Sequence, residues 1–385
     1  MRFPEFSGEW KKCIIQDYGE VITGNTPPTN NAEYYNNGSY LWASPADLGT
    51  GKKINDTKTK LSESGFKKTR IIPKGSILVT CIGSTIGKMG MAVETMSSNQ
   101  QINSIIVNEK SNNDFVYYAI SRAFPRYLSE VGVQAVPILS KSNFEKLPNY
   151  TTSIEEQDKT GYFLNLLDER IATQNKIIED LKKLKSAIIE RHYNQTEKQT
   201  VFIADLGEPF NVGNLSKDDL SETGNPCIIY GELFTTYGET ISQIESHTNK
   251  KEGMTLSKKG DLLFPTSTTV DAISLIAPSV INVDGVILGG DMFGIHISTN
   301  FNAQYLSYYF NHIAKRQLAK FAKGSTIIHL HYTDIEKARL LLPSLEEQNK
   351  MANCLISLDE KIRVEKSYLQ LLDKQKAYLL RQMFI

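Results

Sequence analysis

Two long stretches of the chain place apolar side chains at alternating spacings of three and four residues. One covers residues 155–192, and the other lies after Ser344; neither contains proline. This spacing is the a/d stripe of a coiled coil, so both stretches are predicted to be long amphipathic helices. Ser153 before Glu155 and Glu156 supplies a helix cap and first-turn acids. The stripes consist of Leu164, Leu167, Ile171, Ile178, Leu181 and Ile188, and of Leu355, Leu358, Ile362, Leu369, Leu372 and Leu379.

The two helical stretches are copies of each other. Residues 153–159 (SIEEQDK) reappear 191 positions later as residues 344–350 (SLEEQNK). The same offset carries residues 167–171 (LDERI) onto residues 358–362 (LDEKI). Polar residues interrupt both stripes at matching places, Gln174 with Glu365 and Lys185 with Lys376. Repetition at one fixed offset indicates an internal duplication.

The duplication leaves two arrangements of the helices open. Each helix could pack on a separate core, or the two could pair with each other as an antiparallel coiled coil. Polar residues inside a seam cost stability but fix register and partner. Equal lengths and matched interruptions therefore favour pairing, with pseudo-two-fold symmetry.

The segment before each helix also repeats, more loosely. Residues 15–20 correspond to 203–208 at an offset of 188, and residues 75–78 correspond to 260–263 at an offset of 185. Short β-rich runs between glycine, asparagine and proline predict strands near 76–81, 102–107, 261–264 and 293–297. One helix is expected after them in each copy, near 115–128 and 303–321. The predicted class is α+β: mixed α/β domains at 1–150 and 196–342, each followed by a long helix at 151–195 and 343–385.

Length and composition agree with a chain of several globular parts. The 385 residues exceed one typical domain, and the apolar share of 40% allows packed cores. No stretch approaches the roughly 20 apolar residues of a membrane span, and the first residues lack the order of a signal peptide. The four cysteines, Cys13, Cys81, Cys227 and Cys354, are scattered, which is typical of a reducing cytoplasm. We therefore expect a cytoplasmic protein without a membrane segment.

Charge is balanced overall but not locally. Lysine plus arginine and aspartate plus glutamate number 43 each. Residues 1–150 carry a net charge of +4, whereas residues 201–340 carry −4. Nucleic-acid binders are often basic overall, so any surface of that kind must be local here.

Motifs for catalysis, cofactors and metals are scarce. The string Cys81–Met89 superficially resembles a phosphate-binding loop, but only three residues separate Gly83 from Gly87, and Met89 replaces the magnesium-binding hydroxyl. His329 and His331 would share one face of a strand, but their counterparts Ile138 and Ser140 cannot bind metal. The nucleophile-elbow and dinucleotide patterns are absent. The sequence predicts no catalytic residue, cofactor or metal site.

What remains suits binding. Asn, Gln, Ser, Thr and Tyr crowd several loops and are able to read base edges, and the lysine pairs near them are able to neutralise phosphates. The alternative is that these are ordinary solvated loops. The DNA-binding candidates are Lys52, Lys53, Ser84, Thr85, Lys88, Asn99, Gln100, Gln101, Tyr230, Thr235, Thr236, Tyr237, Lys250, Lys251, Ser267 and Thr268.

Taken together, these strings resemble the specificity (S) subunit of Type I restriction–modification enzymes over essentially the whole chain. The resemblance rests on the opening residues 2–10, on residues 74–78 and 83–88, and on the doubled Glu-Glu-Gln helix starts. Residues 201–340 depart from the first copy by being acidic, and Asp271–Ser274 replaces the Ile86–Met89 stretch.

The resemblance implies a non-catalytic subunit. Each globular domain would be a target recognition domain for one half of a bipartite double-stranded DNA site. The paired helices would dock two modification (methyltransferase) subunits, and a restriction subunit is left open. A stand-alone DNA-modifying or DNA-cleaving enzyme with unrecognised motifs, and a coiled-coil scaffold without a DNA role, are the alternatives.

Overall fold

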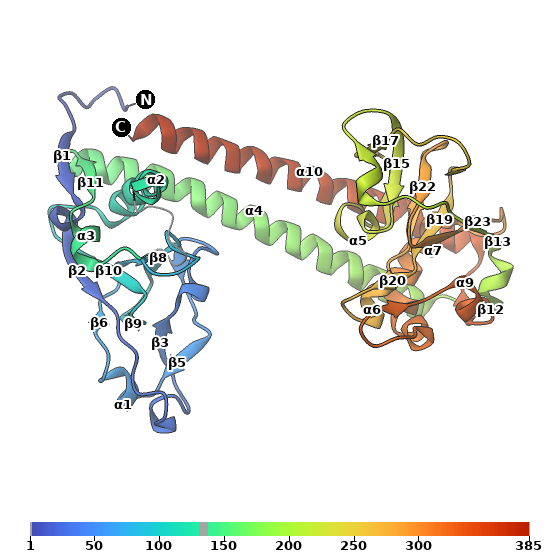
Figure 1. The fold of residues 1–385 in the computed structure, drawn as a ribbon, viewed down its shortest axis with the longest axis horizontal. Helices are drawn as coiled ribbons and strands as arrows, with labels where there is room; N and C mark the ends of the chain where they lie inside the picture. The colour runs from blue at the N-terminus through green and yellow to red at the C-terminus, as the bar shows by residue number, and fades with distance from the viewer. Residues whose placement is uncertain (1, 131–137, 385) are drawn as a thin grey trace. The chain divides into compact units, whose positions relative to one another are not determined.

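The computed structural model describes residues 2–130 and 138–384. The chain divides into two compact units, each of which combines one globular part with part of both long helices. Unit 1 comprises Met1–Lys176 with Ser367–Ile385, and unit 2 comprises Ile177–Lys366. The long helices are α4 (Ile154–Gln195) and α10 (Leu345–Met383), close to the predicted bounds (Figure 1). No helix of the described residues is long and apolar enough to cross a membrane.

Unit 1 is built on two sheets. The first has the order β2-β10-β7-β8-β4 and the second the order β5-β3-β9-β6, while β1 pairs with β11. Helix α2 (Asn113–Glu130) covers the first sheet, and α1 (Glu63–Phe66) and α3 (Lys141–Glu145) are short. The strands are β1 (Lys11–Ile14), β2 (Gly19–Thr23), β3 (Tyr40–Ala43), β4 (Lys53–Ile54), β5 (Thr59–Leu61), β6 (Ile71–Ile72), β7 (Ile77–Thr80), β8 (Met89–Ala92), β9 (Met96–Ser98), β10 (Ile102–Val107) and β11 (Pro148–Thr151).

Unit 2 repeats this plan. Its sheets have the orders β13-β23-β19-β21-β16 and β14-β17-β15-β22-β18, and β12 pairs with β25. A further pair, β20 with β24, has its counterpart in the Ile82–Ile138 bridge of unit 1. The strands are β12 (Gln199–Phe202), β13 (Gly207–Asn211), β14 (Leu220–Ser221), β15 (Asn225–Ile229), β16 (Thr240–Ile241), β17 (Ser246–Thr248), β18 (Thr255–Leu256), β19 (Asp261–Pro265), β20 (Ser267–Thr268), β21 (Ser279–Ile281), β22 (Ile287–Gly289), β23 (Met292–Ile297), β24 (Ile328–His329) and β25 (Arg339–Leu342).

The helix predicted over 303–321 is interrupted in the structure. It begins as α7, passes through a π-helical turn at Phe310–Ala314, and continues as α8 and a 3₁₀ turn at Ala319–Phe321. Such turns redirect the side chains that follow them. The helices of unit 2 besides α4 and α10 are α5 (Glu232–Thr235), α6 (Ala272–Leu275), α7 (Ala303–Tyr309), α8 (Lys315–Leu318) and α9 (Tyr332–Ile335).

The apolar stripes of α4 and α10 face the interior, as predicted. Every stripe position is buried or half-buried, and so are the interrupting residues Gln174, Glu365, Lys185 and Lys376. In unit 1, α4 and α10 contribute Leu164, Leu167, Leu372 and Leu379 to one core with α2 and the first sheet. In unit 2, Ile189 and Leu355 join the core of α7 and its sheet. The helices therefore pair with each other and pack on a globular core at the same time.

The duplicated Glu-Glu-Gln strings tie each long helix to its globular part. The buried Gln157 side chain accepts a hydrogen bond from the Asn112 backbone N–H at 3.0 Å, and Gln348 accepts one from Asn302 at the same distance. The side chains of Asn112 and Asn302 in turn cap α2 and α7. One glutamine in each copy thus fixes the relative position of two helices.

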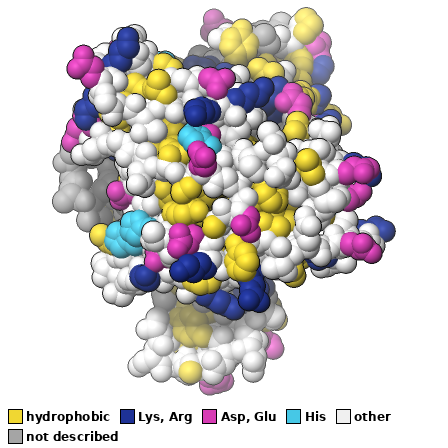
Figure 2. Space-filling model, turned by 90° about the vertical axis from the view of Figure 1, so that its right-hand side faces the viewer, with side chains coloured by type: hydrophobic (Ala, Val, Ile, Leu, Met, Phe, Trp, Pro, Cys, Tyr) yellow, Lys and Arg dark blue, Asp and Glu magenta, His cyan; other side chains and the backbone are white. Residues whose placement is uncertain are grey.

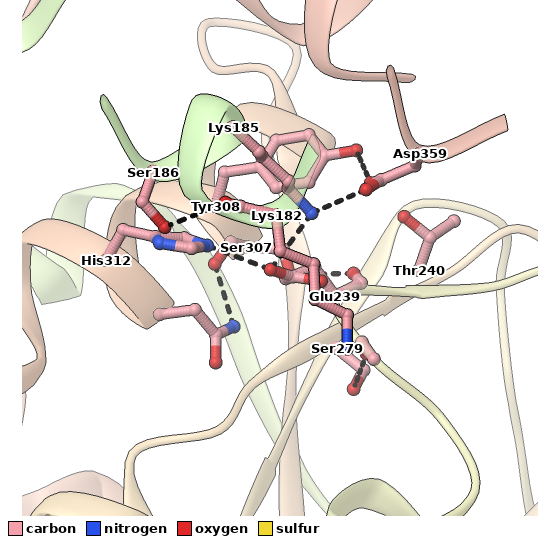
Figure 3. Close-up of polar contacts among 12 residues, drawn as sticks. Lys182, Lys185, Ser186, Glu239, Thr240, Ser279, Ser307, Tyr308, His312 and Asp359 are labelled. Atoms are coloured by element: carbon pink, nitrogen blue, oxygen red, sulfur yellow. Dashed lines mark hydrogen bonds and ion pairs between the residues drawn. The ribbon is translucent and has the colours of Figure 1, made fainter. Parts of the chain in front are cut away.

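The polar interruption at Lys185 is the centre of a charged cluster in unit 2 (Figure 3). Its ammonium group lies 2.6 Å from Asp359 Oδ1 on α10 and 3.1 Å from Glu239 Oε1, ahead of β16. Tyr308 donates to the second Asp359 oxygen at 2.6 Å, and its ring lies under the Lys185 ammonium. His312 Nε2 lies 2.9 Å from Glu239 Oε1. The cluster therefore joins α4, α10, α7 and the globular sheet.

Unit 1 contains the same cluster with one charge reversed. Lys376 Nζ lies 2.5 Å from Asp168 Oδ1, and Tyr118 donates to Asp168 Oδ2 at 2.6 Å. Lys52 directly precedes β4, as Glu239 directly precedes β16, and both strands pair in parallel with the next strand of their sheet. Lys52 therefore occupies the place of Glu239 and pairs with Asp114 and Asn165 instead.

A charged side chain placed in the buried apolar stripe of α10 is expected to destabilise the chain, whereas one placed on the exposed side of the helix is not. Leu372 is 3% exposed, whereas its neighbour Leu371 is 61% exposed. Leu372→Asp buries an unpaired carboxylate and is expected to lower the free energy of unfolding by roughly 3 kcal/mol or more. Leu371→Asp, the matched control, is expected to cost about 1 kcal/mol or less. Urea unfolding of both variants checks this, and equal losses would contradict the orientation of α10.

Glu239 is expected to make stability depend on acidity. Burial alone would raise the pKa of Glu239, but the His312 hydrogen bond and the Lys185 charge outweigh it and lower the pKa to about 2. A carboxylate with a lowered folded-state pKa stabilises the protein above its unfolded pKa of about 4.5 and loses that contribution as pH falls toward 2. Glu239→Gln should therefore cost most stability above pH 5, and the difference from the parent should shrink on acidification. A difference that is constant between pH 6 and pH 3 would show that the charge of Glu239 is not what matters.

Candidate nucleic-acid interface

A cavity of about 780 Å³ in unit 2 gathers five of the predicted DNA-binding residues. Tyr230, Thr235 and Tyr237 come from α5 and its flanks, and Ser267 and Thr268 form β20. Thr236 adjoins α5 but does not line the cavity. The wall also contains Phe234, Thr269, Val270, Asp291, Lys315, Ile327 and His329.

Buried hydrogen bonds hold these loops in place. The Glu232 carboxylate accepts from the Ile229 backbone N–H at 2.9 Å and from Ser246 Oγ at 2.6 Å, which fixes the start of α5. Ser267 Oγ donates to Asp291 Oδ2 at 2.7 Å, so β20 is tied to the start of β23. The cavity wall is therefore formed before any ligand arrives.

Of the two histidines singled out in the sequence, His329 lines this cavity and His331 does not. His329 pairs with Ser267 across β20 and β24, and its ring stacks nearly parallel to that of His331 at 6.2 Å. Among the residues that the structure describes, no group of three or more His, Cys, Asp or Glu side chains could hold a metal ion. The wall offers hydroxyls, imidazole and ammonium groups, which suit hydrogen bonding to base edges and phosphates, together with the carboxylates of Glu239 and Asp291.

A basic turn borders the cavity and was missed by the sequence reasoning. Lys315 lines the cavity, and the exposed Arg316 and Lys320 follow on α8 and the next 3₁₀ turn. Figure 2 shows lysine and arginine side chains mixed with apolar ones on a face of unit 2. The acidic total for residues 201–340 concealed this turn, although the charges of residues 301–340 considered alone would have revealed it.

Lys250 and Lys251 lie outside this cavity wall. Lys250 Nζ is 2.8 Å from Asp219 Oδ1, and this hydrogen bond lowers the pKa of Asp219 to about 2. Lys250 therefore already neutralises a carboxylate of its own unit.

The corresponding surface of unit 1 is built from amides. Asn99 donates to Gln101 Oε1 at 3.1 Å, and Gln101 reaches the Ile82 carbonyl, at the start of the loop that carries Ser84, Thr85 and Lys88. The glycines at 83 and 87 have positive φ angles, which bend this loop back on itself. Gln100 accepts a hydrogen bond from Thr26, whose neighbour Asn25 holds the exposed segment 68–70. Lys68 and Arg70 add positive charge there.

Lys52 and Lys53 lie at the junction with α4 and are not brought together with these amides. Lys52 is buried among Asp114, Tyr118 and Asn165, and burial lowers its pKa despite the Asp114 carboxylate. Lys53 Nζ lies 3.6 Å from Glu169 on α4. The phosphate contact expected of Lys52 is therefore corrected to a structural role, because its ammonium group is enclosed and already paired.

Comparisons with known proteins agree with the internal duplication. The profile of the Type I restriction modification DNA specificity domain matches residues 7–183 and again residues 195–374. The chain is 30% identical over 182 residues to the Type I restriction enzyme MjaIX specificity subunit of Methanocaldococcus jannaschii, covering 46% of this chain and 42% of that protein. It is 24% identical over 407 residues to the MjaVIII specificity subunit of the same organism, covering 98% and 91%.

Other relatives match over shorter stretches or by fold. The Type I restriction enzyme HindI specificity subunit of Haemophilus influenzae is 32% identical over 151 residues, 38% of this chain and 32% of that protein. The matched region thus spans less than half the length of two of these relatives. The crystal structure of a Type I restriction–modification S subunit from M. genitalium shares the fold, with a TM-score of 0.63, 15% identity, and coverage of 98% and 96%.

The two profile matches together cover most of the chain, and their boundary falls near the end of α4, where the structural duplication begins again. The chain therefore belongs to the Type I restriction modification DNA specificity domain family.

Proposed function

We propose that this chain is the DNA-recognition subunit of a Type I restriction–modification enzyme, that each unit reads one half of a bipartite site, and that the chain itself catalyses no reaction. The observation that carries the proposal is the duplication of one scaffold with different chemistry at equivalent surfaces. Gln100 and Gln101 of unit 1 correspond to Gly290 and Asp291 of unit 2, because β10 and β23 begin directly after them. A scaffold that repeats while its exposed loops diverge suits recognition of two different half-sites.

Phosphate contacts would come from different elements in the two units. In unit 2 the basic turn at Lys315, Arg316 and Lys320 borders the cavity, and in unit 1 Lys68, Arg70 and Lys88 accompany the amide loops. Such contacts supply affinity without sequence information, whereas the hydroxyls and amides between them supply base readout. The neutral net charge is compatible with this role because each basic group is local.

The outer faces of the long helices are proposed to dock the modification subunits. Exposed apolar side chains recur at heptad spacing on α10, at Val364, Leu371 and Tyr378, and on α4 at Ile177 and Leu184. These positions lie outside the buried stripe, and an exposed apolar row of this kind marks an interaction surface. Two modification subunits, one for each unit, fit the duplication.

Removal of the basic turn is expected to weaken binding to all DNA sequences. In a complex with its modification subunits, Arg316→Ala with Lys320→Ala should lower the affinity for cognate and scrambled duplexes by a similar factor. The slope of log affinity against log salt should fall by roughly 1 to 2, because about 0.9 counterion is released per neutralised phosphate. The control is Lys258→Ala with Lys259→Ala. It also removes two positive charges, but just before the start of β19, whereas the cavity residues Ser267 and Thr268 follow the end of that strand.

This experiment also tests the proposed function itself. The cognate sequence is obtained by sequencing the methylated motif of the host genome. A parent complex that binds cognate and scrambled duplexes equally would refute DNA recognition, and an equal loss in the control pair would refute the assignment of the basic turn.

A charge on the outer row of α10 is expected to impair assembly without unfolding the chain. Leu371→Asp places a carboxylate in the proposed docking face and should reduce co-purification with the modification subunit at least tenfold, since burial of an unpaired charge is costly. Lys366→Asp on the same helix is the control, because Lys366 is charged and exposed and, two residues from Val364 and five from Leu371, lies off the outer row. Full assembly of the Leu371 variant would exclude this face as the docking site.

A further inference from the structure

Exposed apolar side chains line the cavity of unit 2. Phe234, Val270 and Ile327 all line the cavity, and Val270 is 73% exposed. Large apolar side chains at such exposure are unfavourable in water unless a partner covers them. The same wall carries hydroxyls and is bordered by the basic turn, so these apolar groups belong to the surface proposed to face DNA.

Hydrogen bonds that recur in both units identify the corresponding segments. The Thr266 N–H bonds to the Asp291 carbonyl at 2.8 Å, as Cys81 does to Gln101, so the loop that carries Val270 follows β19 as residues 82–88 follow β7. The capping bonds Ile229 N–Glu232 and Ser44 N–Asp47 likewise place Phe234 at the position of Gly49. Unit 1 therefore presents a bare backbone at Gly49 where unit 2 presents the apolar Phe234 side chain.

We propose that unit 2 recognises its half-site through the C5-methyl groups of thymine, with Val270, Phe234 and Ile327 as the contacts. Thymine is the base that presents an apolar group in the major groove, and apolar side chains are its partners in direct readout. Hydroxyls of Ser267 and Thr268 would supply the neighbouring polar contacts. Unit 1, which offers Gln100, Gln101 and Thr85 instead, would read its half-site by hydrogen bonds.

This proposal rests on the proposed DNA-recognition function, and its test separates the two. The complex with modification subunits is given duplexes of the methylated motif in which deoxyuridine replaces thymine in one half-site at a time. Removal of each contacted methyl from the unit 2 half-site should weaken binding about fourfold. The same replacement in the unit 1 half-site should change affinity less than twofold.

Val270→Ser assigns the effect to this residue. Val270 is exposed, so the fold should be retained, and the substitution removes both methyl groups that would contact thymine. The variant should bind thymine and deoxyuridine duplexes with a ratio closer to one than the parent. Leu256→Ser, at another exposed apolar position of unit 2 in β18, should keep the parent ratio.

Each outcome decides a different point. Equal binding of cognate and scrambled duplexes refutes the proposed function. Three results refute methyl recognition and leave the proposed function standing: sequence-specific binding that is insensitive to deoxyuridine in the unit 2 half-site, a unit 2 half-site without an A·T pair, or an unchanged ratio in Val270→Ser.

Discussion

The cross-helix pair of lysine and aspartate is the interaction on which the arrangement of each unit depends. Lys185 with Asp359 and Lys376 with Asp168 lie at partly buried positions inside polar clusters, where removal of one partner would leave a charge unpaired at a cost in free energy. A shift of either helix by one residue would separate the partners and leave both charges unpaired. A stripe made only of leucines would let one helix slide along the other, because each leucine would meet another leucine after the shift. The polar pair therefore specifies a register that the apolar seam does not.

The same aspartates also connect the helix pair to the globular parts. Tyr118 and Tyr308 donate to the carboxylate oxygens that the lysines leave free. Burial and the adjacent Asp359 raise the pKa of Tyr308, so its hydroxyl remains a donor. The next residue in each cluster carries opposite charges in the two units, Lys52 in unit 1 and Glu239 in unit 2. This difference is tolerated because each residue has partners within its own unit: Asp114 and Asn165 for Lys52, and Lys185 and His312 for Glu239. Divergence between the copies thus begins one residue beyond the shared tyrosine.

Much of this architecture could be predicted from the sequence, because duplication and heptad spacing are visible in one dimension. The bounds of α4 and several strands were foreseen within a few residues, and the matched interruptions at Lys185 and Lys376 correctly indicated pairing. The structural role of Lys52 was not foreseeable. The adjacent residues Lys52 and Lys53 are chemically alike, and nothing in the sequence indicates that Lys52, just before β4, is the buried one. The π-helical turn after α7, which leads into the basic turn, likewise has no evident signal in the local sequence.

The basic turn illustrates why summed charge misleads for a recognition domain. At physiological salt the Debye length is about 8 Å, so the electrostatic potential at a phosphate beside Arg316 is set mainly by the charges nearest to it and not by the total for the unit. Affinity for DNA depends on the charges within that distance, and residues outside it are free to be acidic. Acidic residues elsewhere reduce nonspecific attraction along the rest of the surface. In the proposed mode of binding, a near-neutral chain with local groups of basic residues therefore favours discrimination between sequences over bulk affinity.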